Sequence, residues 1–191
     1  MGRAAVFLDG GYLSKVLKYV FNEPDIDYEK FSEEICEGDE RLRTYYYDCM
    51  PYQSYPPTEK ESKMYAQKDK FIYNIKKLRR FEVRLGKLVY IPSAGDFIQK
   101  RVDVLLSVDL VRMSWDHQIS KAVLVTGDSD FVPAIEAAKD AGVLTVLYYS
   151  SASKVRALDE LLYACDERRE ITQGLINSCL LKRKNQQVRN S

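Results

Sequence analysis

Short runs of apolar residues alternate along this chain with longer segments in which apolar residues recur every three or four positions. The first pattern is typical of strands in a buried sheet, and the second is typical of amphipathic helices packed on it. The strand-like runs lie at residues 4–8, 41–47, 81–85, 88–91, 121–126 and 143–149, with a last short one at 170–172. The helix-like segments lie at residues 12–20, 27–36, 58–80, 103–113, 132–141 and 153–165. The alternation predicts an α/β fold, a three-layer α/β/α domain with a mostly parallel central sheet.

Three of the predicted helices carry more specific expectations. The helix at 58–80 opens with the capping-box pattern Thr58-x-x-Glu61. Its inward stripe would be Met64, Phe71, Ile75 and Leu78. The helix at 103–113 is apolar on nearly every side, so we expect it to be buried. The helix at 153–165 would pack through Val155, Leu158, Leu161 and Leu162.

Aspartates follow two of the predicted strands at the point where each strand ends. Asp128 and Asp130 come directly after the strand at 121–126, and Asp9 follows the strand at 4–8. In open α/β sheets the ligand crevice lies at the carboxyl ends of the strands. The glycines after Asp9 would also let backbone approach a ligand closely. The sequence therefore predicts a cluster of carboxylates at one edge of the sheet.

Each of these acids also has a purely structural interpretation. Asp9, or one member of the Asp128–Asp130 pair, could cap the helix that follows, and the other member could tighten the turn. Asp103 would be a favourable acid in the first turn of its helix. Asp109 has no such role, although an unpaired carboxylate in an apolar helix is costly. It lies about 120° round the helix from Asp103, so the two are not direct neighbours.

Composition and charge change the picture in two ways. The 191 residues are most simply one domain, and the net charge of +1 gives no overall steering field. Residues 60–87, however, carry ten Lys or Arg against three acidic residues. With Tyr65 and Tyr73 interleaved, this face is either a solvated surface or a track for a nucleic-acid backbone. We expect no membrane partner and a cytoplasmic location, because we find no signal peptide and no apolar run of spanning length.

The residues that are scarce narrow the chemistry. A single histidine, His117, disfavours a histidine-based zinc site or a Ser-His-Asp triad, and the four scattered cysteines are best interpreted as reduced thiols. What remains is carboxylate oxygen, the ligand preferred by Mg²⁺ and Mn²⁺. A carboxylate cluster holding such ions suits phosphoryl chemistry.

Three motifs carry a resemblance to a known family. FLDGGYL at 7–13, KRVDVLLSVD at 100–109 and TGDSDF at 126–131 resemble the motifs of the NYN domain family, in its LabA-like (DUF88) branch. That family belongs to the PIN-like nuclease superfamily, and the resemblance spans residues 4–165. It implies a PIN-like fold and metal-dependent cleavage of RNA, with Mg²⁺ or Mn²⁺ as cofactor and single-stranded RNA as the expected substrate.

Residue roles follow from the same resemblance. The catalytic and metal-binding set would be Asp9, Asp103, Asp128 and Asp130, with Asp109 as a supporting acid. Substrate contacts would come from Gly10, Gly11, Tyr12, Lys100, Arg101 and Ser129. We add to these the basic cluster of Lys76, Lys77, Arg79 and Arg80. Tyr12 is a departure, because many members of the family have Asn at that position.

The function expected from the sequence is a metal-dependent ribonuclease that leaves 5′-phosphate ends. The alternative is a catalytically inert RNA-binding or partner-binding adaptor of the same fold. A phosphatase of the haloacid dehalogenase type needs a second Asp at the position of Gly11, and a Toprim-like site needs Glu where Asp9 stands. We expect residues 1–175 to form the domain and residues 176–191 a basic, disordered tail. A homo-oligomer is left open.

Overall fold

The protein is described here from a computed structural model that covers residues 2–91, 96–100 and 102–181, with side chains omitted at 88–91 and 96–100. The described residues form a seven-stranded sheet in the order β4-β3-β2-β1-β5-β6-β7. The strands are β1 (Arg3–Asp9), β2 (Glu40–Cys49), β3 (Phe81–Ile91), β4 (Asp96–Lys100), β5 (Lys121–Val125), β6 (Leu144–Tyr149) and β7 (Glu167–Glu170). All neighbours are parallel except β3 and β4, which form an antiparallel hairpin. The mostly parallel sheet expected from the sequence is confirmed.

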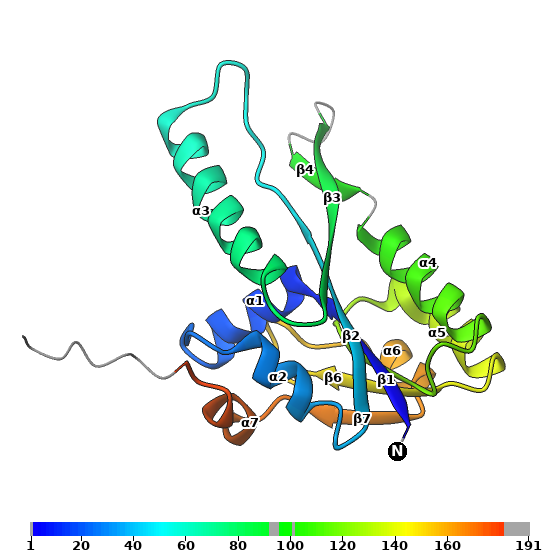
Figure 1. Ribbon diagram of the computed structural model, residues 1–191. Coiled ribbons are helices and arrows are strands. Elements are labelled where there is room, and N and C mark those ends of the chain that lie inside the picture. The colour runs from blue at the N-terminus through cyan, green and yellow to red at the C-terminus, as the bar shows by residue number, and fades with distance from the viewer. Residues whose placement is uncertain (1, 92–95, 101, 182–191) are drawn as a thin grey trace, which may run out of the picture.

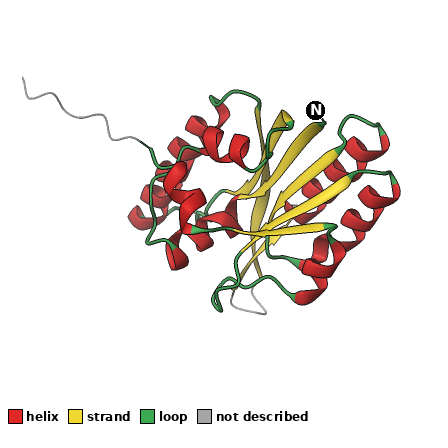
Figure 2. Cartoon of the chain, turned by 90° about the horizontal axis from the view of Figure 1, so that it is seen from below, coloured by secondary structure: helices red, strands yellow, loops and turns green. Residues whose placement is uncertain are grey.

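Helices cover both faces of this sheet (Figures 1 and 2). They are α1 (Gly10–Val20), α2 (Tyr28–Glu34), α3 (Glu59–Lys76), α4 (Val102–Trp115), α5 (Val132–Asp140), α6 (Asp159–Ala164) and α7 (Gln173–Ser178), with a 3₁₀ turn η1 (Ser129–Phe131). The even residues of β1, such as Val6, share one apolar cluster with α1, α2, α3 and α7. Its odd residues, such as Phe7, share the other cluster with α4, α5 and α6. The domain is therefore a three-layer α/β/α sandwich, as expected.

The order of the strands reverses direction at β1. From β1 the chain passes through α1 and α2 to β2 on one side, and later returns through α4 to β5 on the other side of β1. Helices α1 and α4 lie on opposite faces, so they leave an opening between them at the carboxyl ends of β1 and β5. This is the topological switch point at which open α/β sheets bind ligands.

The prediction of a helix at 153–165 is wrong for the first half of that range. Residues 154–158 are not helical, and burial there alternates with a period of two because Val155 and Ala157 point inward. Leu158, which we expected in the core, is 58% exposed. Only Asp159–Ala164 forms α6. The apolar residues Val155, Leu158, Leu161 and Leu162 have helical spacing, but the first two lie in a non-helical segment and the last two lie in α6.

Two other helices differ from their expected burial. In α3, Met64 is half-exposed, and Ile72 together with Ile75 makes the buried contact instead. Helix α4 was expected to be buried all round, yet Val104, Val108 and Trp115 face solvent. The reason is that α4 packs on the sheet and on α5 through one side only, which leaves its outer apolar side without a neighbour among the described residues.

The described structure continues past residue 175, where we expected the domain to end. That boundary falls inside α7, and Ile176 and Cys179 are fully buried. Leu180 then forms an antiparallel bridge with Ile26. The C-terminal segment therefore packs on the chain that leads into α2 as far as residue 181. All four cysteines are free thiols and buried, in agreement with the sequence analysis.

Candidate active site

Asp9 is the last residue of β1, and its carboxylate faces two strand ends. Oδ1 accepts a hydrogen bond from the Tyr12 N–H at 3.0 Å, which caps α1. Oδ2 accepts one from the hydroxyl of Thr126, beyond β5, at 3.4 Å. Burial, with a smaller contribution from the charge of Asp48, raises the pKa of Asp9 from 3.8 to about 6. Asp9 therefore caps α1, as the sequence suggested. Its carboxylate also lies in a buried environment that disfavours the charged form.

Asp128 occupies the equivalent place after β5. Its carboxylate accepts a hydrogen bond from the Asp130 N–H at 3.0 Å and so caps η1, and its own N–H donates to the Thr126 hydroxyl at 3.2 Å. Thr126 therefore holds both strand ends in one arrangement. Asp130 is exposed, in the 3₁₀ turn itself.

One pocket of about 390 Å³ brings most of the predicted acids together. Its lining consists of Asp9, Gly11, Tyr12, Lys15, Asp103, Gly127, Asp128, Ser129, Lys154, Val155, Arg156 and Leu158. Asp103 enters it from the first turn of α4, across from the ends of β1 and β5. Burial, followed by the charges of Asp128 and Asp130, raises the pKa of Asp103. Asp130 does not line the pocket, but it acts on it through this charge.

Asp109 lies outside this pocket in a network of its own. Its carboxylate accepts hydrogen bonds from the Tyr47 hydroxyl at 3.1 Å and Arg84 Nε at 3.1 Å. Arg112, one turn further along α4, is 3.4 Å away. These partners offset the cost of burying a carboxylate, and they explain how an acidic residue can stand in the apolar sequence of α4. The position of Asp109 is accounted for by packing α4 against β2 and β3.

Asp48 is the acid that sequence reasoning missed. It stands at the carboxyl end of β2, beside β1, and is 5% exposed. Its carboxylate accepts hydrogen bonds from the Tyr46 hydroxyl at 2.9 Å, the Cys49 N–H at 2.7 Å and Lys68 Nζ of α3 at 2.5 Å. The strand expected at 41–47 is directly followed by Asp48, so the same signal of a strand followed by an Asp was present and was overlooked; β2 itself continues to Cys49.

Two glycines allow these groups to approach one another. A Cβ at Gly10 would lie 2.8 Å from Asp48 Oδ2 and closer still to the Tyr46 hydroxyl. A Cβ at Gly127 would strike the ring of Tyr12, 2.9 Å from its Cδ2. The Tyr12 hydroxyl accepts a hydrogen bond from the Ser150 N–H at 2.8 Å. Tyr12, the departure noted in the sequence, therefore fills the floor of the pocket and ties α1 to the end of β6.

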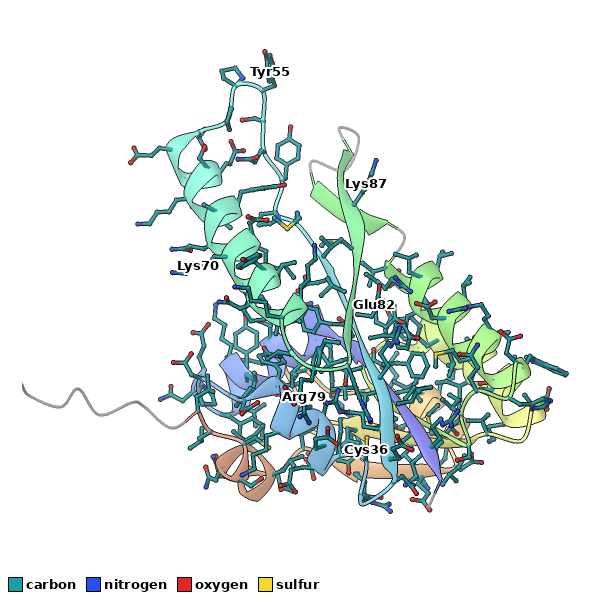
Figure 3. All side chains as sticks on the ribbon, viewed as in Figure 1. Cys36, Tyr55, Lys70, Arg79, Glu82 and Lys87 are labelled. Carbon is teal, nitrogen blue, oxygen red and sulfur yellow. The ribbon has the colours of Figure 1, made fainter. Side chains whose placement is uncertain are left out.

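The predicted substrate cations are not gathered at this pocket. Arg79 and Arg80 follow α3 at the amino end of β3, where they pair with Glu29 at 3.0 Å and Glu40 at 3.5 Å. Figure 3 shows Arg79 at the opposite end of α3 from Tyr55. Lys76 and Lys77 belong to the same end of the helix. The side chains of Lys100 and Arg101 lie outside the described residues. The cations that do line the pocket are Lys15, Lys154 and Arg156.

The acidic residues fit a hard divalent cation by their donor chemistry. Asp9, Asp103 and Asp128 present carboxylate oxygens to one pocket, and the pKa of two of them is raised by burial and neighbouring negative charge. A divalent cation relieves this kind of strain. Within the described part of the chain, no group of three His, Cys, Asp or Glu side chains stands together in a metal-binding arrangement.

Comparison with known proteins identifies the family. The model of the NYN domain matches residues 3–172. The chain belongs to the NYN domain family. Proteins of this family are part of the PIN-like nuclease superfamily, and the α/β architecture with its parallel sheet is the PIN-like fold. This confirms the family and fold expected from the three motifs.

The comparison with solved structures shows the fold alone. The fold is similar to that of a protein of unknown function from Vibrio parahaemolyticus, with a TM-score of 0.66 and 17% sequence identity. The match covers 94% of this chain and 96% of that one. No curated protein gives a significant match. Among the described residues, no helix has the length and apolar character needed to cross a membrane.

Proposed function

We propose that this NYN protein is a metal-dependent ribonuclease of the LabA-like (DUF88) branch, which hydrolyses single-stranded RNA. The observation that carries the proposal is the convergence of Asp9, Asp103 and Asp128 on one pocket at the switch point of the sheet. Carboxylates arranged in this way, in a chain of a nuclease superfamily, suit phosphodiester hydrolysis with Mg²⁺ or Mn²⁺.

The roles of the side chains follow from their positions. Asp9 and Asp128, fixed by Thr126, would hold the cation, and Asp103 faces them from α4. Asp130 would act through its charge on Asp103, and Asp48 stands next to Asp9 as a further acid. A bound Mg²⁺ or Mn²⁺ would supply a water of lowered pKa and neutralise charge on the phosphate.

The remaining pocket residues would position the phosphate. Gly11 and Ser129 line the pocket and offer space and polar hydrogens to phosphate oxygens. Lys15 lies near enough to Asp9 for its charge to lower the pKa of that carboxyl, against the larger effect of burial. On this proposal, the basic end of α3, with Lys76, Lys77, Arg79 and Arg80, contacts the RNA backbone further away.

The products follow from the nucleophile. Water attacks phosphorus in line, the 3′-oxygen leaves with the bonding electrons, and a proton completes the 3′-hydroxyl. The other fragment keeps a 5′-phosphate. The single histidine, His117, lies outside the pocket, so it does not provide the paired acid and base that would activate the ribose 2′-hydroxyl.

The test is cleavage of end-labelled single-stranded RNA with Mn²⁺, Mg²⁺ or excess EDTA. We expect cleavage with either ion, 5′-phosphate ends, and a loss of at least 100-fold in Asp9→Asn and Asp128→Asn, because charge stabilisation of this kind contributes about that much. Asp116→Asn, an exposed acid outside the pocket, is the matched control. Cyclic phosphate ends or full activity in EDTA would contradict the mechanism. RNA binding without cleavage under every condition would favour the adaptor function instead.

A further inference from the structure

One side of the acidic pocket is a wall that carries positive charge. Residues 154–158, to which the proposed hydrolysis gives no role, form part of this wall, because their side chains point alternately inward and outward. Val155 packs into the apolar cluster of α1, and Ala157 packs into the cluster of α5 and α6 on the other face of the sheet. Anchored in this way, the segment presents Lys154, Arg156 and Leu158 to the pocket.

Helix α1 continues this wall on its exposed side. Lys15 lines the pocket, and Tyr19 lies one turn further along the same face of the helix. The ring of Tyr19 is an exposed aromatic surface, with 51% of the residue accessible. The ammonium groups of Lys18 and Lys154 lie 5.7 Å and 5.4 Å from its centroid. An aromatic ring with two ammonium groups near its face therefore lies next to Lys154, which itself lines the pocket of the carboxylates.

The cations of this wall are available to a ligand. Arg156 pairs only with Asp159 among the described contacts, at 3.1 Å, and the two side chains are 61% and 64% exposed. An ion pair so exposed contributes little and exchanges readily for another anion. Lysine ammonium groups on flexible stems can likewise turn from the face of an aromatic ring toward a phosphate. The wall thus offers three mobile positive charges beside Asp9, Asp103 and Asp128.

This charge arrangement suits one class of ligand. Carboxylates alone repel a phosphate backbone, so a strand that reaches them needs cations on its approach. Proteins that bind single-stranded nucleic acid combine such cations with aromatic rings on which unpaired bases stack. A duplex keeps its bases stacked inside and offers no free base to Tyr19.

We propose that Lys15, Tyr19, Lys154 and Arg156, here called the basic wall, bind the backbone and one unpaired base of a single-stranded RNA next to the acidic pocket. This inference deepens the proposed function, on which it rests for the identity of the ligand. The three cations contact phosphates, and the ring of Tyr19 stacks on a base.

The experiment measures binding without cleavage. Fluorescence anisotropy of a labelled 12-nucleotide uridine RNA is recorded in EDTA at several salt concentrations. Lys154→Gln/Arg156→Gln should bind about tenfold more weakly at low salt. Its plot of log affinity against log salt should be shallower by about 1.4, because two phosphate contacts on a single strand are lost. Lys30→Gln/Arg43→Gln removes the same charge from exposed positions on α2 and β2, and should leave affinity unchanged.

Substitution of Tyr19 separates stacking from charge. Tyr19→Ala should weaken binding about tenfold without changing the salt slope, and Tyr19→Phe should bind like the wild type because it keeps the ring. Lys154, Arg156 and Tyr19, the three positions changed in the basic-wall variants, are exposed, so thermal melting should be unchanged and confirms that each variant is folded.

Two results would overturn the proposal: equal losses in the basic-wall and control variants, or tight binding of duplex RNA with the same dependence on Tyr19. The outcome is independent of the chemistry in the pocket. A protein that binds through the basic wall but never cleaves RNA contradicts the proposed hydrolysis alone. A protein that cleaves RNA with unchanged affinity in the basic-wall variants contradicts this inference alone.

Discussion

The hydroxyl of Thr126 lies 3.4 Å from the carboxylate of Asp9, although the two residues are 117 positions apart in the chain. The same hydroxyl accepts a hydrogen bond from the Asp128 N–H at 3.2 Å. One buried side chain thus connects the ends of β1 and β5, and with them the two acids on which the candidate site depends. The site is therefore organised at the edge of the sheet, where β1 and β5 end.

The stability of the protein should fall as Asp9 ionises. Its pKa is 3.8 in the unfolded reference and about 6 in the folded protein, so the folded state binds more protons between those values. The free energy of unfolding should therefore decrease as pH rises from about 4 to about 6. Asp9→Asn, which can still cap α1, should remove this decrease and be more stable than wild type at pH 8 by roughly 3 kcal/mol.

Urea denaturation in EDTA at pH 4, 6 and 8 measures this difference. The stabilisation by Asp9→Asn should be small at pH 4, where the folded carboxyl is already protonated, and complete at pH 8. Asp116→Asn serves as the control and should show no such trend. A stabilisation of the same size at every pH would mean that the charge of Asp9 is not its cause.

Millimolar Mn²⁺ should raise the melting temperature of the wild-type protein. A ligand that binds only the folded state stabilises it by mass action, by about 2.7 kcal/mol at a hundred times its dissociation constant. The double variant Asp9→Asn/Asp128→Asn should lose this rise in melting temperature, and the control Asp116→Asn should keep it. Asp109→Asn is not a suitable control, because its carboxylate is buried in an ion-pair network. An unchanged melting temperature in wild type would refute a metal site.

Lys68 should matter for stability through Asp48. Its ammonium group is 2.5 Å from a carboxylate whose side chain is 4% exposed. Lys68→Gln leaves that charge buried without its cation, so we expect a loss of about 2 kcal/mol. The double variant Asp48→Asn/Lys68→Gln should recover part of this loss. Lys70→Gln, an exposed position on the same helix, provides the control, and additive effects in the double variant would show that the two side chains are not coupled.

Gly127→Ala should damage the pocket by displacing Tyr12. The new methyl group would meet the tyrosine ring, and overpacking of this kind costs about 1–3 kcal/mol. Tyr12→Ala should relieve the clash, so the double variant should be less impaired than the sum of the two single variants. Gly174→Ala in α7 meets an atom only at 3.7 Å and should be neutral. Independent, additive losses would contradict a direct contact.

The fold and most of the acidic site could be predicted from local patterns. The strand runs before Asp9 and Asp128 are continuous and apolar because both faces of a parallel sheet are covered, which makes their ends easy to locate. Parallel order then brings those ends to one edge. Asp103 could be proposed as a further carboxylate from its place at the start of a helix, but its approach to the other acids depends on how α4 packs.

The parts that were missed depend on tertiary contacts. Asp48 was overlooked because β2 begins with interspersed polar residues and lacks the continuous apolar run of β1 and β5, and because its cation, Lys68, comes from a different element. The basic wall was hidden because Val155 and Leu158 have helical spacing, although Val155 is anchored in a different layer from Ala157. The predicted cations at the end of α3 cluster along the chain, but clustering in sequence does not indicate at which edge of the sheet the side chains lie.

Trp115, exposed near the end of α4, determines what optical measurements on this protein can report. It is the only tryptophan of the chain and 56% of it is accessible in the folded state. Its emission should therefore resemble that of a hydrated indole before any denaturant is added, and it would record unfolding of the core poorly. For the same reason, the fluorescence of this one residue is a background-free reporter: any molecule that covers the outer side of α4 would shift its emission to the blue.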